Sequence, residues 1–182
     1  SSGTVLVENL PVEAFNLIPS WKSYDTPTLA GPFAQLTTAA IDAGIARAAL
    51  NDTVSFVNQF ARPWIDASVE RAGDDPLTIY QIGALDSKLA AADALLEQAG
   101  KVLDRYKHDL SEETVALASV AVARAKIFTT EAALEAATRL FELGGTRSTH
   151  PRYNFDRHWR NGRVHTLHDP VRWKYHLLGN WV

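Results

Sequence analysis

The chain has 182 residues, a formal net charge of −3 and no cysteine, which allows one main domain and excludes disulfides, thiolate metal ligands and cysteine nucleophiles. The absence of cysteine also favours a cytoplasmic location. No run of about 18 apolar residues and no signal-peptide pattern is present, so we expect neither a membrane span nor a membrane partner.

Residues 1–28 are unlike the remainder of the chain. Residues 4–7 and 9–12 predict a short pair of extended segments with a turn between them, and Pro19, Pro27 and Pro32 prevent a long helix. Because two strands alone do not form a stable sheet, we expect this segment to belong to a sheet whose other strands lie outside the chain.

Two long helices are predicted next. The first begins at Gly31, with Pro32 in its first position, and ends before Pro63; its apolar stripe includes Ile41. The second begins at Asp75, an N-cap followed by proline, and keeps a helical period of apolar residues to about residue 108.

A third helix is capped by Ser111 and stops at Gly144 and Gly145. Each of the three helices has roughly 30 residues and is about 45 Å long at 1.5 Å per residue. Long alanine-rich helices followed by a short fourth helix predict an all-α fold, an up-down helical bundle. Helices of this length often present a second apolar face to another subunit, so we expect a homo-oligomer.

The candidate chemical groups are concentrated near the C-terminus. Four of the six histidines, with two tryptophans and two tyrosines, lie between Tyr153 and His176. Residues 147–174 carry seven Lys/Arg and two Asp/Glu, a balance of +5, against −8 for the remainder. This basic, aromatic segment either folds back on the acidic body or faces an anionic ligand.

The loop before the last helix allows several interpretations. After a helical turn at 155–160, Asp169-Pro170 predicts an N-cap and a helix start; Asp169 can also be a catalytic base, although the spacing favours the cap. His165 and His168 could bind a metal or transfer protons, but no companion ligand motif accompanies them, so we expect no metal. A proton-transfer or hydrogen-bonding role for one histidine stands against a surface or capping role.

Two further features are ambiguous by themselves. The arginines and tryptophans of residues 157–173 form either an anion or nucleic-acid surface or ion pairs with the acidic helices; we favour the ion pairs and expect no nucleic-acid partner. One glycine is enough to stop the third helix, and a second, followed by Thr146 and Arg147, would let the backbone approach a phosphate. Arg62, after the first helix, has no unique interpretation.

Three motifs in order, VENLPVEAFNLIP, LFELGGTRST and RNGRVHTLHDP, resemble the C-terminal helical domain of the acyl-CoA dehydrogenase superfamily. The similarity covers nearly the whole chain. ARPWIDASVERAGDDPLTI and NFDRHWRNGRVHTLHDPVRWKYH look most like its flavin-dependent monooxygenase branch, the sulfur-acquisition and dibenzothiophene monooxygenase-like enzymes. The resemblance implies that residues 1–28 are a remnant of the middle β domain with a linker, and that residues 29–182 form the C-terminal helical-bundle domain.

The resemblance also implies an activity, that of a reduced-flavin-dependent monooxygenase in sulfur metabolism. Reduced FMN would come from a separate flavin reductase, with FAD as the other candidate cofactor, and oxygen would form a C4a-hydroperoxyflavin that oxygenates a small organosulfur compound. Family members are homotetramers, and the remainder of the same polypeptide would complete the active site. The alternatives are an acyl-CoA dehydrogenase with an atypical base and a non-enzymatic oligomerisation or nucleic-acid-binding module.

Two catalytic residues are implied by the resemblance. The dehydrogenases place a catalytic Glu, preceded by Tyr, before the last helix; here these positions hold Asp169 and His168. Asp is one methylene shorter than Glu, which argues against removal of a substrate α-proton. The monooxygenases use a histidine here, so His168 is predicted to hydrogen-bond the flavin and to protect or protonate the oxygen adduct.

The implied cofactor-binding residues are Arg62, Gly144, Gly145, Thr146 and Arg147. They match family positions that contact the flavin's phosphate end across a subunit boundary. A Gln commonly precedes the double glycine in the dehydrogenases and serves the adenylate half of FAD, whereas here the approach reads Phe-Glu-Leu. A carboxylate near a pyrophosphate is repulsive, which favours FMN over FAD.

Overall fold

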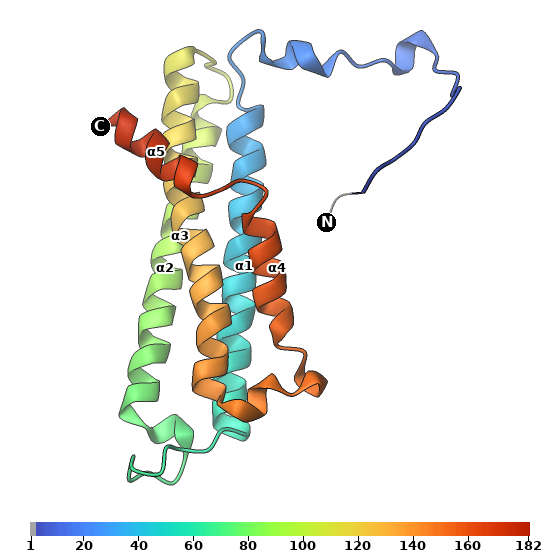
Figure 1. The fold of residues 1–182 in the computed structure, drawn as a ribbon. Helices are drawn as coiled ribbons and strands as arrows, with labels where there is room; N and C mark the ends of the chain where they lie inside the picture. Colours follow the sequence, from blue (N-terminus) through green and yellow to red (C-terminus); the bar gives the residue numbers. More distant parts are fainter. Residues whose placement is uncertain (1–2) are drawn as a thin grey trace.

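The computed structural model describes residues 3–182 as an all-α bundle (Figure 1), as predicted. Three long helices, α1, α2 and α3, stand side by side, and the shorter α4 and α5 follow at the C-terminus. The α-helices are α1 (Ala30–Gln59), α2 (Pro76–Tyr106), α3 (Glu112–Gly144), α4 (Asp156–Thr166) and α5 (Arg172–Trp181). Short 3-10 turns are η1 (Ala14–Asn16), η2 (Ser20–Tyr24), η3 (Ala72–Asp74), η4 (Thr146–Thr149) and η5 (Pro151–Tyr153).

Local caps explain where the long helices begin. The Asp75 side chain accepts a hydrogen bond from the backbone N–H of Leu77, and Ser111 forms a reciprocal capping box with Thr114, so both predicted N-caps are confirmed. The first helix starts at Ala30, slightly earlier than predicted, without a side-chain cap. Pro32 lies in its first turn, where the missing N–H leaves no helical bond unmade.

The core lies between the three long helices and is rich in alanine, which permits close approach. Helix α3 is central, since it contacts α1, α2, α4 and α5. One apolar cluster joins its C-terminal half to the middle of α1 and the first half of α2; a second lies nearer its N-terminus. The buried members are Ala46, Ala49, Leu50, Leu85, Leu89, Ala92, Ala132, Ala133 and Ala136 in the first, and Ala99, Leu103, Ala118, Val122 and Ala125 in the second.

The predicted extended pair at residues 4–7 and 9–12 does not form paired strands. No strand is present anywhere in residues 3–182, and the segment before α1 extends away from the bundle (Figure 1). Its apolar side chains are exposed, including Val5, Leu6 and Phe15. A two-stranded pair needs further strands or a packed face to be stable, and the described part of the chain supplies neither. The domain boundary near residue 28 stays a prediction.

Two predictions for the tail are corrected. The expected turn at 155–160 is a complete 11-residue helix, α4. Asp169 does not cap the last helix: α5 begins at Arg172 with Val171 at the N-cap and no side-chain cap bond. The carboxylate of Asp169 instead lies 3.0 Å from Nζ of Lys174. The charged ammonium group of Lys174 is a stronger hydrogen-bond donor to this carboxylate than the uncharged backbone N–H groups at the helix start.

None of the helices in the described part of the chain is long and apolar enough to cross a membrane.

Candidate functional site

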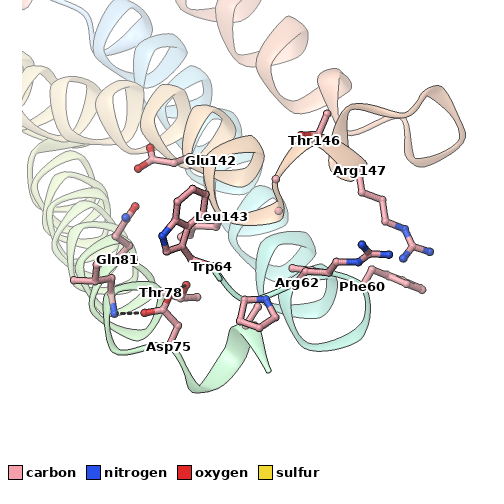
Figure 2. A pocket seen from close by; sticks show the side chains of 16 residues that line it. Phe60, Arg62, Trp64, Asp75, Thr78, Gln81, Glu142, Leu143, Thr146 and Arg147 are labelled. Carbon is pink, nitrogen blue, oxygen red and sulfur yellow. Dashed lines mark hydrogen bonds between the residues drawn. The ribbon is translucent and has the colours of Figure 1, made fainter. Parts of the chain in front are cut away.

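A pocket of about 850 Å³ opens at the end of the bundle where α1 and α3 terminate and α2 begins (Figure 2). All five predicted cofactor-binding residues line it: Arg62, Gly144, Gly145, Thr146 and Arg147. They come from two segments that are far apart in sequence. The two segments meet because α1 and α2 run antiparallel, as do α2 and α3, which brings both segments to the same end of the bundle. The structure therefore gathers these residues, and their binding of a flavin stays a prediction.

The two glycines of the turn have different structural reasons. Gly145 adopts φ +65°, a conformation that side chains rarely allow, and a Cβ there would meet no atom within 4 Å. A Cβ on Gly144 would lie 2.7 Å from Cβ of Ser148 and 3.1 Å from Cδ1 of Phe56. Packing thus accounts for Gly144, whereas Gly145 leaves an open stretch of backbone at the pocket, suitable for close approach of an anion.

Two arginines supply positive charge to this pocket. Figure 2 shows the side chains of Arg62 and Arg147 extending toward the same side of it. The guanidinium carbon of Arg147 lies 5.2 Å from the ring centroid of Phe60, and its Nε donates to the hydroxyl of Tyr153 at 3.3 Å. A planar guanidinium held in this way is suited to phosphate oxygens, which it can bind in bidentate fashion.

The pKa of Tyr153 is shifted by the two arginines next to it, Arg147 and Arg152. Burial acts to raise the pKa of its phenol, but hydrogen bonds from Arg152 and Arg147, with their positive charges, outweigh burial and hold this pKa below its usual value. The two arginines therefore favour the ionised form of the Tyr153 phenol.

An aromatic cluster fixes the chain between α3 and α4 against the end of α1. The ring of Phe56 meets those of Tyr153 and Phe155 edge-on, at centroid distances of 5.0 and 5.3 Å. Tyr153 stacks on Phe155 at 5.5 Å and lies 5.9 Å from Phe60. These contacts hold the loop that carries Arg147 in one position relative to Arg62.

Glu142 contributes a carboxylate to the same pocket. Its Oε2 atom accepts from Nη1 of Arg139 at 2.5 Å, and the side chain is about half exposed, at 49%. The pocket lining therefore combines the guanidinium groups of Arg62 and Arg147 with two carboxylates, those of Glu142 and Asp75.

The two predicted catalytic residues lie elsewhere. His168 lines a groove of about 690 Å³ between α1 and α4, together with His165, Ile41, Ile45, Trp159, Arg160, Asn161, Arg163 and Val164. The rings of His165 and His168 are 6.2 Å apart at 64°. Asp169 is not part of this groove, since its carboxylate pairs with Lys174. The glycine turn precedes α4 and His168 follows it, so α4 separates the two regions.

A residue that was not predicted from the sequence contacts His165 from inside the bundle. Asp42, completely buried on α1, lies with Oδ1 2.6 Å from Nδ1 of His165. The available signal was a charged residue at a helical position adjacent to the predicted stripe. Ile41, assigned to that stripe, is 51% exposed, whereas its neighbour Asp42 is 0% exposed. Within residues 3–182, no group of three or more His, Asp or Glu side chains is arranged to hold a metal ion.

Comparisons with known proteins identify a family for most of the chain. Residues 36–173 match the family described as acyl-CoA dehydrogenase, C-terminal domain. The chain is 42% identical over 159 residues to a dibenzothiophene monooxygenase from Mycolicibacterium goodii, covering 85% of this chain and 38% of that protein. It is 34% identical to a probable FMNH2-dependent monooxygenase from Pseudomonas putida, covering 100% of this chain and 47% of that protein.

A solved structure shares the same arrangement of helices. The crystal structure of TdsC from Paenibacillus sp. A11-2 with FMN and indole superposes with a TM-score of 0.79 at 34% identity, over 82% of this chain and 39% of that one. The chain therefore spans less than half the length of each of these three proteins.

Proposed function

Because the chain belongs to the acyl-CoA dehydrogenase family and matches the C-terminal domain of its members, we propose that the full-length polypeptide is a reduced-flavin monooxygenase acting on a small organosulfur compound. The relatives named as a dibenzothiophene monooxygenase and an FMNH2-dependent monooxygenase support this proposal. The observation that carries it is the pocket in which Arg62, Gly145 and Arg147 meet.

The pocket residues fit the phosphate end of FMN. The guanidinium groups of Arg62 and Arg147 would bind phosphate oxygens, and the open backbone at Gly145 would let the phosphate approach closely. When bound, reduced FMN supplies the electrons that activate oxygen, through the adduct expected from the sequence. A separate flavin reductase would provide the reduced cofactor.

Glu142 supports FMN rather than FAD as the cofactor. Its carboxylate lines the same pocket as the two arginines and forms an ion pair with Arg139. FAD would add a second phosphate and an adenosine near this negative charge, at an electrostatic cost that the single phosphate of FMN avoids.

We further propose that the glycine turn and His168 of one chain serve different flavin molecules in a homotetramer. The 11 residues of α4 place them roughly 16 Å or more apart, at 1.5 Å per residue. Large apolar side chains that a neighbouring subunit would cover are exposed on α2 and α5. They include Leu77, Ile79, Tyr80, Trp173 and Tyr175.

The groove histidines would act at the flavin ring, whereas the glycine turn would bind the phosphate. His168 is exposed in the groove and would hydrogen-bond the flavin and protect its oxygen adduct, as expected from the sequence. The carboxylate of Asp169 is already engaged by Lys174. We therefore propose that Asp169 holds the loop that carries His168 in place and does not itself take a proton.

A rapid-reaction experiment on the full-length polypeptide tests the function. The protein is loaded anaerobically with reduced FMN, mixed with ¹⁸O₂ and dibenzothiophene, and followed by flavin absorbance and product mass. A transient flavin–oxygen adduct and one ¹⁸O atom in a sulfoxide product are expected. Reoxidation without an adduct, with bleaching of bound FAD by an acyl-CoA, would replace this proposal with an acyl-CoA dehydrogenase.

A further inference from the structure

A charged pair lies in the interior of the bundle between α1 and α3. Asp42 and Lys126 are completely buried, and Nζ of Lys126 donates to Oδ2 of Asp42 at 2.6 Å. The hydroxyl of Thr130 donates to the same oxygen at 2.9 Å. Desolvation of two charges offsets much of their attraction, and an apolar pair of similar volume is often at least as stable. Stability alone therefore does not account for this pair.

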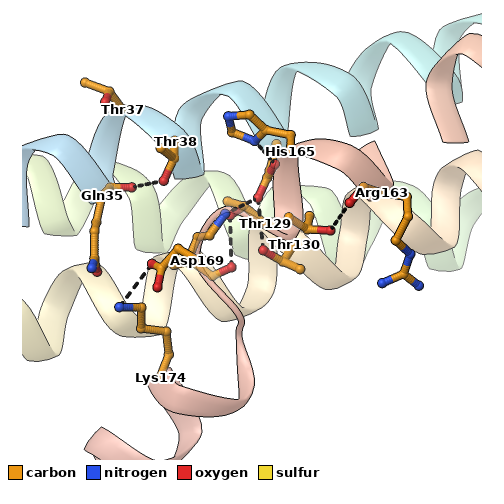
Figure 3. Close-up of polar contacts among 12 residues, drawn as sticks. Gln35, Thr37, Thr38, Thr129, Thr130, Arg163, His165, Asp169 and Lys174 are labelled. Atoms are coloured by element: carbon orange, nitrogen blue, oxygen red, sulfur yellow. Dashed lines mark hydrogen bonds and ion pairs between the residues drawn. The ribbon is translucent and has the colours of Figure 1, made fainter. Parts of the chain in front are cut away.

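The second oxygen of Asp42 binds His165, and this contact determines how the imidazole is oriented (Figure 3). A carboxylate oxygen only accepts, so Nδ1 of His165 carries the hydrogen in the 2.6 Å contact. Lys126 balances the negative charge of Asp42 from the other side. Nε2 of His165 is then the ring nitrogen that does not contact Asp42.

The His165 side chain reaches the groove from the bundle interior. The His165 side chain is 20% exposed and lines the groove with His168. Its ring lies 6.2 Å from that of His168. The groove thus contains two neighbouring imidazoles, one held from the interior by a buried carboxylate and one exposed in the loop that follows α4.

We propose that Asp42 and Lys126 are positioning residues that hold His165 so that its Nε2 exchanges a proton with the reactant in the groove. Nε2 accepts a proton in one step and returns it in a later step, so the histidine is unchanged after a turnover. A carboxylate that binds Nδ1–H fixes the tautomer and orientation needed for this exchange. The identity of the reactant rests on the proposed function; the orientation of His165 does not.

The decisive variant replaces the charged pair by apolar side chains, Asp42→Leu with Lys126→Met, in the full-length polypeptide. Neither charge of the pair is left alone in the interior, so this variant is expected to fold, with a melting temperature modestly lowered because Thr130 and His165 lose their acceptor. The matched control is Asp52→Asn, which alters the other Asp–His contact between α1 and α4, where Oδ2 of Asp52 lies 2.7 Å from Nε2 of His158. Loss of folding in the double variant would assign the pair to stability and overturn the proposal.

The first readout does not depend on enzyme activity. Diethyl pyrocarbonate acylates imidazole nitrogens, and peptide mass spectrometry gives the rate at each histidine. In the wild type His165 should react faster than the buried His158, whose Nε2 contacts Asp52. In the double variant the rate at His165 should fall at least about threefold, because the contact that strengthens Nε2 as a nucleophile is gone. An unchanged or higher rate overturns the positioning role, and the Asp52→Asn control should leave His165 unaffected.

The second readout is turnover. His165→Ala and the double variant should each lower kcat at least about tenfold with little change in KM, and the two losses should not add when combined. Wild-type turnover in a folded double variant would show that the pair is only structural. If the wild type itself oxygenates no organosulfur compound, the function proposed above fails, and the acylation rates still decide whether Asp42 positions His165.

Discussion

Oδ2 of Asp52 lies 2.7 Å from Nε2 of His158 and 2.5 Å from Nη2 of Arg157. One carboxylate on α1 therefore binds two consecutive residues near the start of α4, and Asp42 binds His165 near its end. These contacts fasten α4 antiparallel to α1 (Figure 1). Because α4 connects the glycine turn to the histidine groove, the two Asp–His contacts hold the two ends of this connection against α1 independently.

Asp52→Ala is predicted to destabilise the fold. His158 is buried, and its Nε2 would lose its partner. An unsatisfied buried polar group costs about 1–3 kcal/mol, and thermal or denaturant unfolding would measure the loss. Asp93→Ala is the matched control, since it removes the exposed ion pair with Arg47 and should change stability by less than about 1 kcal/mol. Equal effects of the two substitutions would contradict a structural role for the Asp52–His158 contact.

The glycine turn is predicted to tolerate no side chain. Gly144→Ala forces Cβ against Ser148 and Phe56, and Gly145→Ala places alanine at φ +65°, so each should cost about 1–3 kcal/mol and weaken FMN binding. Gly83→Ala, in an open position of α2, should instead be neutral or stabilising by up to about 1 kcal/mol. Unfolding curves and fluorescence titration with FMN, run on all three variants, test this difference.

Arg147→Ala and Arg62→Ala are predicted to weaken FMN binding about 10- to 100-fold each, the equivalent of one charge-assisted hydrogen bond. Riboflavin, which lacks the phosphate, should bind the variants and the wild type equally. Arg105→Ala, an exposed arginine at the far end of α2, is the control and should leave FMN affinity unchanged. Equal losses for riboflavin and FMN would show that the arginines do not bind the phosphate.

Glu142→Gln is predicted to raise the affinity for FAD more than the affinity for FMN. The substitution removes the negative charge beside the glycine turn and keeps the shape of the side chain. Calorimetric titration with both flavins at low and high salt measures the ratio, and the gain should shrink as salt screens the charge. An unchanged FAD to FMN ratio would remove Glu142 as the cause of cofactor selection.

Tyr153 and Tyr175 are predicted to titrate on opposite sides of the usual tyrosine range. Hydrogen bonds and charge from Arg152 and Arg147 outweigh burial and lower the pKa of Tyr153, whereas the hydrogen bond to Glu131, together with burial, raises the pKa of Tyr175. Absorbance at about 295 nm, followed as pH rises, should show one phenolate that forms below the usual tyrosine range and one that forms above it. The first should be absent in Tyr153→Phe and the second in Tyr175→Phe.

The sign of the pH effect follows from these directions. A phenol whose folded-state pKa is lowered stabilises the fold fully above its unfolded pKa, near 10, and loses this stabilisation as pH falls through the folded-state value. The wild type should therefore gain stability relative to Tyr153→Phe as pH rises through this alkaline window. A constant difference between the two proteins across the window would contradict the predicted shift.

The helix ends that depend on local chemistry could be predicted from the sequence. Asp75 and Ser111 cap α2 and α3, and the double glycine ends α3, because each signal acts through hydrogen bonds or dihedral angles within a few residues. The same local logic was wrong at Asp169, where the ion pair with Lys174 replaces the cap.

Which side chains meet could not be predicted from local patterns, because it depends on the assembled bundle. Arg62 and Arg147 share one pocket because the helices return to the same end of the bundle. Periodicity identified an apolar stripe on α1 but could not show that Ile41 is exposed and Asp42 completely buried. The burial of Asp42 depends on Lys126 of α3 and His165 of α4, which approach it only when the bundle is assembled. The free energy of a buried charge is set by such long-range partners, and no local sequence pattern encodes them.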